Sequence, residues 1–179
     1  MTGHRINSWR GLGWGGAACL LLAPLVAMQF TPVVNWTPSD FIFAALLLGS
    51  VGGLFELAVR LSGSAAYRIA AALGLGASFL VVWANGAVGI IGNENDPINL
   101  VFLAILALGL AGALLARFRP GGMAMTLAAM AGGMLAMALY VLATNPNREA
   151  LFIAVFAGLW FLASGLFRKA AQLETALRA

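Results

Sequence analysis

Six apolar runs, each about as long as a bilayer's hydrocarbon layer is thick, constrain this chain more than any other feature. A helix needs roughly 20 residues to cross about 30 Å of hydrocarbon at about 1.5 Å per residue. The runs occupy residues 12–30, 41–59, 69–91, 98–116, 123–143 and 150–167. Of all residues 62% are hydrophobic and only 9% are charged, whereas soluble domains carry about 25% charged residues. This composition excludes soluble, disordered and coiled-coil proteins and predicts an all-α membrane protein.

The charged residues predict how these spans are oriented. Nine of the ten basic residues fall on one side if the spans alternate in direction: Arg5, Arg10, Arg60, Arg68, Arg117, Arg119, Arg168, Lys169 and Arg178. Arg148 falls on the other side with Asp40, Glu94, Asp96 and Glu149. Because an excess of Lys and Arg marks the cytoplasmic face, we expect both termini in the cytoplasm. The net charge of +4 is only a small basic excess, which is weak support for binding nucleic acid. The placement of the basic residues on one side of the spans indicates the lipid bilayer as partner instead.

The connections are short, so sequential helices should be antiparallel neighbours. We expect a single transmembrane domain over residues 1–179, built as an antiparallel six-helix bundle. The first run has an alternative interpretation as a cleaved signal peptide ending near Leu25-Val26-Ala27. We favour retention, because Leu25 is not the small residue that cleavage prefers and the run has spanning length. Cleavage would leave five spans in the same orientation.

The three connections on the acidic side each carry an Asn near a Pro. The spacing from Pro38 to Arg60, from Pro97 to Arg119 and from Pro146 to Arg168 is 22 residues each time. Three related helical hairpins would explain this spacing. A simpler explanation is that Pro opens a helix, Arg anchors its other end and one membrane thickness separates them. We favour the simpler explanation, because little else matches between the hairpins.

Glu56 is the first polar candidate within a span. It precedes Arg60 by four residues, and this order and spacing favour an ion pair on one helical face. The carboxylate could bind a proton as a functional site, or it could form an ordinary interfacial pair with Arg60. We favour the ordinary pair, because Glu56 lies near the headgroups.

Asn85 is the second candidate, since polar side chains in hydrocarbon are costly. Gly86, Gly89 and Gly92 recur every three residues beside it, which predicts a helix edge open to a neighbour or ligand. We favour Asn85 as a hydrogen bond between helices. Glu94 and Asp96 lie in the following loop, whose many oxygen atoms offer a weak signal for a hard cation such as Ca²⁺.

Soft-metal and cofactor chemistry has little support in the sequence. The chain has one cysteine, Cys19, and one histidine, His4, which lies in the amino-terminal tail. Met130, Met134 and Met137 share one helical face. Thioether clusters can bind Cu(I), but we favour packing, and we expect no metal and no cofactor. Glycines at 49, 52, 53, 109, 112, 132 and 133 predict close helix contacts, and residues 169–178 are compatible with an amphipathic surface helix.

Two stretches carry a family resemblance. Residues 83–99 read W-x-N-x-A-V-G-I-I-G-x-E-x-D-P-x-N, and residues 117–123 read R-F-R-P-G-G-M. Together they resemble a group of small bacterial polytopic membrane proteins, over about the middle third of the chain. The resemblance implies the bacterial inner membrane and brings no activity with it.

Three function classes follow, in order of preference. We expect a non-enzymatic accessory or structural subunit that acts through helix contacts, within a larger membrane complex or a homo-oligomer. The alternative is a small transporter or channel with a polar outer vestibule around Asn85 and Glu94. A membrane-bound enzyme or cofactor carrier comes last, because no catalytic set or phosphate-binding loop is present.

Overall fold

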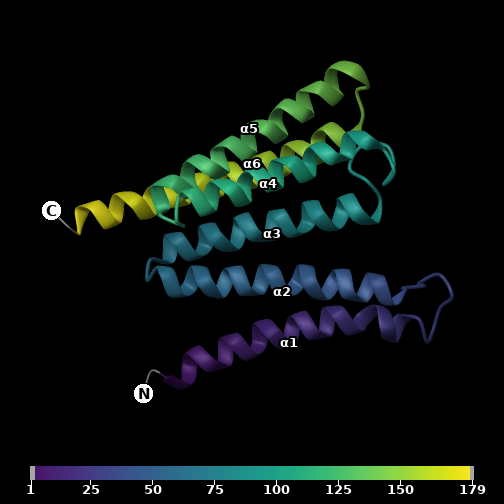
Figure 1. Cartoon of the computed structure of the whole chain (residues 1–179), viewed down its shortest axis with the longest axis horizontal. Helices are drawn as coiled ribbons and strands as arrows, with labels where there is room; N and C mark the ends of the chain where they lie inside the picture. Colours follow the sequence, from purple (N-terminus) through teal and green to yellow (C-terminus); the bar gives the residue numbers. More distant parts are fainter. Residues whose placement is uncertain (1–2, 178–179) are drawn as a thin grey trace. The chain divides into compact units, whose positions relative to one another are not determined.

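Six α-helices account for most of the chain in the computed structural model, which describes residues 3–177 and their side chains from Arg10 onward (Figure 1). They are α1 (Gly3–Ala27), α2 (Pro38–Leu61), α3 (Ala65–Ala87), α4 (Leu100–Leu115), α5 (Pro120–Thr144) and α6 (Arg148–Ala176), with a 3-10 turn, η1 (Pro97–Asn99), before α4. Residues 3–177 contain no strand. All six helices are long and apolar enough to cross a membrane. The prediction of an all-helical chain with six helices of membrane-spanning length is therefore confirmed.

The helix ends differ from the limits of the apolar runs. The third helix begins and ends four residues early, at Ala65 and Ala87 instead of 69 and 91. The sixth runs past 167 to Ala176, because the polar segment after Phe167 consists largely of good helix formers. The segment that we expected to be helical, residues 169–178, is helical as far as Ala176 and continues α6 without a break. Arg178 lies outside the described residues.

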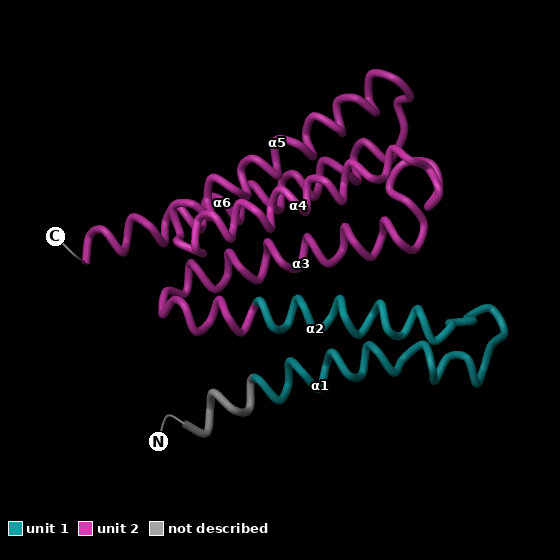
Figure 2. The backbone as a smooth tube through the Cα atoms, viewed as in Figure 1, with its two compact units in different colours: residues 1–54 teal, residues 55–179 magenta. Residues whose placement is uncertain are grey.

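Contacts divide the chain into two compact units, residues 1–54 and 55–179, and the division lies inside α2 (Figure 2). In unit 1, the Trp14 ring lies so close to Gly52 that a Cβ there would stand 3.0 Å from it. Trp36 and Phe41 also make an edge-to-face contact at 5.2 Å. No residue in the apolar part of α1 is buried within the structure. The expectation of a single domain stays a prediction.

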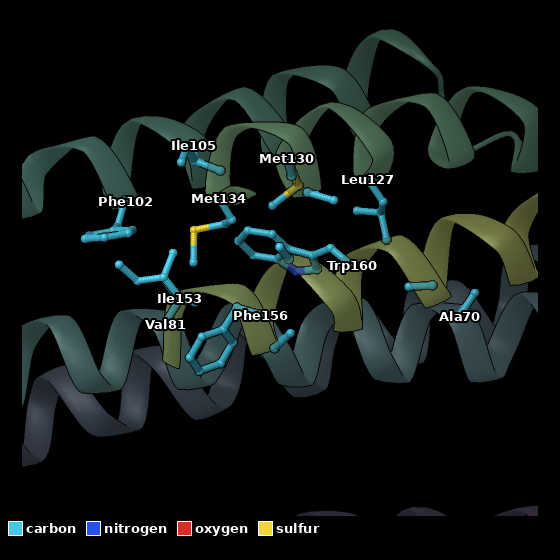
Figure 3. Close-up of a cluster of buried hydrophobic side chains, with 14 of the residues drawn as sticks. Ala70, Val81, Phe102, Ile105, Leu127, Met130, Met134, Ile153, Phe156 and Trp160 are labelled. Atoms are coloured by element: carbon cyan, nitrogen blue, oxygen red, sulfur yellow. The ribbon is translucent and has the colours of Figure 1, made fainter. Parts of the chain in front are cut away.

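The core of unit 2 is built around α6, which packs most closely against α5 and α3. The buried side chains of α6 follow a three- and four-residue spacing, so they form one stripe along the helix. Figure 3 shows Trp160 within this core, with Met130 and Met134 of α5 beside it. The largest fully buried side chains are Trp160, Phe102, Phe167, Met134, Ile153 and Val81.

Helix α4 packs against α5 through small residues. A Cβ at Gly109 would collide with the Met130 side chain, and one at Gly112 would collide with Thr126. Gly133 likewise lies close to Ile105. The predicted close contacts are therefore present at Gly52, Gly109, Gly112 and Gly133, but nothing lies within 4 Å of a Cβ built at Gly49, Gly53 or Gly132. Met130 and Met134 are buried and Met137 partly so, as the packing interpretation requires.

Candidate functional site

Polar residues gather in the segment 88–99 between α3 and α4, which we call the α3–α4 loop. The chain leaves the helix after Ala87 and turns at Gly89 and Gly92, which have φ of +73° and +69°. A Cβ at Gly89 would collide with the Asn93 carbonyl carbon, and one at Gly92 would overlap the Asp96 carboxylate. Both positions therefore require glycine.

The predicted glycine edge is wrong. Gly86 belongs to α3 and is exposed, whereas Gly89 and Gly92 lie beyond the end of the helix and cannot share a helical face with it. Their three-residue spacing reflects two left-handed positions in one loop. These glycines shape the loop backbone instead of admitting a neighbouring helix.

Asn99 holds the α3–α4 loop together, and the sequence analysis missed its role. The residue is only 3% exposed. The backbone N–H groups of Ile90 and Ile91 each donate to its Oδ1 at 3.0 Å. Its Nδ2 donates to the carbonyl oxygens of Ile91 and Asn93, at 2.9 and 2.8 Å. One signal was available: Asn99 stands at the start of an apolar span, where an unbonded amide would be costly.

The two predicted carboxylates lie in this loop and serve its internal hydrogen bonds. Oδ2 of Asp96 accepts from the backbone N–H and from Nδ2 of Asn93, both at 3.4 Å. Oε1 of Glu94 accepts from Nδ2 of Asn95 at 3.3 Å, on the exposed side of the loop. Among the described side chains, those of residues 10–177, no three His, Cys, Asp or Glu residues gather in a way that could hold a metal ion. The hard-cation hypothesis gains no support from this arrangement.

Glu149 ties the α3–α4 loop to the start of α6. The Gly92 N–H donates to Oε1 of Glu149 at 3.2 Å. Asn147 caps α6, with its Oδ1 accepting from the Glu149 N–H at 2.9 Å and its Nδ2 donating to Oε2 of Glu149 at 3.1 Å. An acidic side chain at a helix N-terminus is favourable because the free N–H groups carry partial positive charge. The loop is therefore fixed to the start of α6, an element distant in sequence.

Asn85 stands apart from this network. It lies in the last turn of α3 and is half-buried, yet its Oδ1 is buried without a hydrogen-bond partner. A buried acceptor without a donor costs about 1–3 kcal/mol. Within the described chain no neighbouring helix donates to this oxygen, so the expected hydrogen bond between helices is not formed through it. Asn85 Oδ1 is therefore a buried acceptor of α3 that no donor satisfies within the described residues.

Glu56 is placed on α2, away in sequence from the other candidates. Its Oε2 accepts from the Arg60 guanidinium at 3.3 Å, with the Arg60 side chain 68% exposed and that of Glu56 22% exposed. This is the ion pair that the spacing predicts. The structure thus gathers Gly89, Glu94 and Asp96 in one loop, places Asn85 and Gly86 in the helix before it, and leaves Glu56 on another helix.

Other polar side chains of unit 2 link its helices. Trp160 Nε1 of α6 donates to the Gly74 carbonyl of α3 at 3.2 Å. Ser164 Oγ of α6 donates to the Ala124 carbonyl of α5 at 2.7 Å. Both side chains are buried. These groups join helix to helix through backbone oxygens and leave no polar atom of their own free for a ligand.

Comparison with protein-family models, curated proteins and solved structures found no match to this chain. The function is therefore argued from the residues of the protein itself.

Proposed function

We propose that this protein is a non-enzymatic accessory or structural subunit of the bacterial inner membrane that works through helix contacts. The observation that carries the proposal is how unit 2 uses its interior polar side chains. Trp160 and Ser164 donate their hydrogen bonds to backbone carbonyls of neighbouring helices. Transport routes and catalytic sites place such groups along a path or around a reacting centre. Here they stabilise packing, as a scaffold requires.

The finer topology belongs to the same proposal: an antiparallel bundle with both termini in the cytoplasm. The distribution of basic residues supports the orientation. Contacts within unit 2 support the antiparallel order. Ser164, late in α6, reaches Ala124, early in α5, while Glu149, at the start of α6, reaches Gly92, just beyond α3. The inner membrane as location rests on the resemblance of residues 83–99 and 117–123.

Native mass spectrometry of the protein, extracted gently from its own membranes at native abundance, tests the proposal. We expect a companion polypeptide in fixed stoichiometry. A homo-oligomer would keep the structural role but remove the companion, and a monomer with no bound protein would contradict the accessory role. Extraction in a second, milder amphiphile controls for loss of a partner during solubilisation.

A second candidate function is a small transporter or channel with a polar outer vestibule. The unpartnered Oδ1 of Asn85 favours it, because such an acceptor could receive a donor from a passing solute. The protein reconstituted in liposomes would then carry solute, and Asn85→Leu would abolish the flux while Asn95→Leu, in the exposed loop, would not. Flux with this pattern would displace the accessory role. Equal background flux for all three proteins would eliminate the transporter.

A further inference from the structure

Tyr67 gathers three segments at one end of unit 2. Its hydroxyl donates to the Phe118 carbonyl, between α4 and α5, at 2.7 Å. Its ring meets that of Phe167 in α6 edge-to-face at 4.9 Å. The start of α3, the α4–α5 turn and the later part of α6 therefore lie together, as Figure 2 shows within unit 2. Tyr67 itself is 2% exposed, so this junction is a packed one.

Four basic residues flank the two phenylalanines and form what we call the basic cluster: Arg117, Arg119, Arg168 and Lys169. All four are exposed. Among the side chains from residue 10 to 177, no carboxylate forms an ion pair with any of them, Glu174 on the same helix included. The four basic side chains therefore have no ion-pair partner among the described residues, although Glu174 interacts electrostatically with the nearby Tyr67.

Two other arginines of unit 2, Arg60 and Arg68, already have partners within the protein. The Arg60 guanidinium is paired with Glu56. Arg68 donates from Nε to the Ser62 carbonyl at 2.9 Å and from Nη2 to the Val59 carbonyl at 3.2 Å, which satisfies backbone oxygens at the end of α2. Within residues 10–177, the contrast separates Arg60 and Arg68, which have a structural partner, from the four residues of the basic cluster, which have none.

Exposed apolar side chains adjoin the basic cluster. Leu115 is 85% exposed and lies two residues before Arg117. Leu162 is 61% exposed and precedes Lys169 by seven residues, so it lies two turns away on the same face of α6. Since these helices are of spanning length, such side chains meet acyl chains while the charges meet the headgroup layer. Free phosphate would use only the charges.

We propose that the basic cluster is a binding site for an anionic phospholipid, with the phosphate on the guanidinium and ammonium groups and an acyl chain along Leu115 or Leu162. Arginine forks match phosphate oxygens in pairs. Basic side chains at the headgroup level attract anionic lipid. The site goes beyond the accessory role, because it depends on the spanning helices and not on any partner.

The test measures phosphatidylglycerol retained by the full-length protein after reconstitution in phosphatidylcholine vesicles that contain it, using native mass spectrometry. Arg119→Gln/Lys169→Gln removes two charges of the cluster. Arg60→Gln/Arg148→Gln removes two charges outside it and is the matched control. Each surface charge changes lipid affinity about fivefold. For two charges, we therefore expect the cluster variant to lose roughly 25-fold in affinity and the control to change little.

Circular dichroism of both variants checks that they remain helical. If the cluster variant unfolds, the lipid retained by Arg119→Lys/Lys169→Arg is measured in its place. This variant keeps both positive charges, so we expect it to retain the lipid. The proposal would be overturned if both double variants lost phosphatidylglycerol equally, or if the protein retained phosphatidylcholine as well as phosphatidylglycerol. Loss of phosphatidylglycerol by the charge-conserving variant would also overturn it. Displacement of the lipid by inorganic phosphate at similar affinity would identify a simple phosphate site and would also overturn it.

Discussion

Two asparagines at the ends of neighbouring spans have opposite environments. Asn99 satisfies both its oxygen and its amide nitrogen within one loop, through four hydrogen bonds. Asn85 buries its oxygen with no donor near it. The asparagine side chain therefore stabilises the loop at position 99 and destabilises the fold locally at position 85. The two effects can be tested by separate substitutions.

Asn99→Asp should lower the free energy of unfolding by about 2–4 kcal/mol. The new carboxylate would still accept from Ile90 and Ile91, but it would face the carbonyls of Ile91 and Asn93 without a donor. Thermal unfolding in a neutral detergent measures the change. Asn95→Asp, exposed in the same loop, should shift the transition little, and similar loss in both variants would contradict the role of Asn99.

Gly89→Ala should destabilise the protein by roughly 2 kcal/mol or more, because the residue has a left-handed φ and its Cβ would collide with the Asn93 backbone. Gly86→Ala is the matched control, since Gly86 is helical and exposed, and alanine favours a helix. We expect Gly86→Ala to be neutral or stabilising. A neutral Gly89→Ala would mean that the loop can adopt another conformation. Urea titration in mixed micelles compares the two.

At the scale of the elements, the turn between α4 and α5 is fixed by backbone hydrogen bonds and by a side chain of α3. Helix α4 ends in a Schellman motif, in which the N–H of Phe118 donates to the Ala113 carbonyl and that of Arg117 to the Leu114 carbonyl. Arg117 and Phe118 have positive φ, at 49° and 57°, although neither is glycine. Tyr67 holds this turn through the Phe118 carbonyl.

Arg117→Gly should therefore raise the free energy of unfolding by about 1 kcal/mol, because glycine adopts the left-handed conformation without a Cβ penalty. Arg119→Gly has the same loss of charge but stands at φ of −68°, so it should give no gain. Thermal unfolding in a neutral detergent, where lipid binding does not contribute, provides the comparison. A loss of stability in Arg117→Gly would show that the arginine side chain stabilises the turn by more than the strain.

Tyr67→Phe should cost about 1 kcal/mol, since the ring contact with Phe167 remains and only the hydroxyl bond is lost. Tyr140→Phe, on the exposed face of α5, is the control and should have little effect. Hydrogen exchange of the α4–α5 turn reads the change locally. Unchanged exchange of that turn would show that the hydroxyl does not hold it.

Hydropathy alone predicted the number and approximate position of the helices, because spanning length in an apolar run leaves few alternatives. The ends were predicted less well. Gly89 and Gly92 look like a helical repeat in sequence, and only their φ values show that α3 has ended. The continuation of α6 depends on the helix propensity of polar residues, to which hydropathy does not respond. The role of Asn99 was not predicted, because its hydrogen-bond partners are backbone atoms and no pattern of side chains in the sequence indicates them.

At the scale of the whole molecule, the orientation of the spans is the property that most needs a direct measurement. In a Cys19→Ser background, Asn95→Cys should react with a membrane-impermeant maleimide in intact spheroplasts. Gly63→Cys should react only after permeabilisation, because it lies in a connection on the basic side. Both positions are exposed in the structure, so access and not burial decides the result. The reverse pattern would invert the proposed topology.

The length of α6 sets a geometrical condition on the membrane around it. Its 29 residues extend about 43 Å at about 1.5 Å per residue, against about 30 Å of hydrocarbon. Hiding the whole helix would need a tilt of roughly 45°, beyond the range of about 0–40° found for spanning helices. Some turns of α6 must therefore extend beyond the hydrocarbon layer as a rigid helical stem, by which we mean the part of α6 outside that layer. A fluorophore at Thr175 would report rotation of that stem directly, without a flexible tether between the probe and the core.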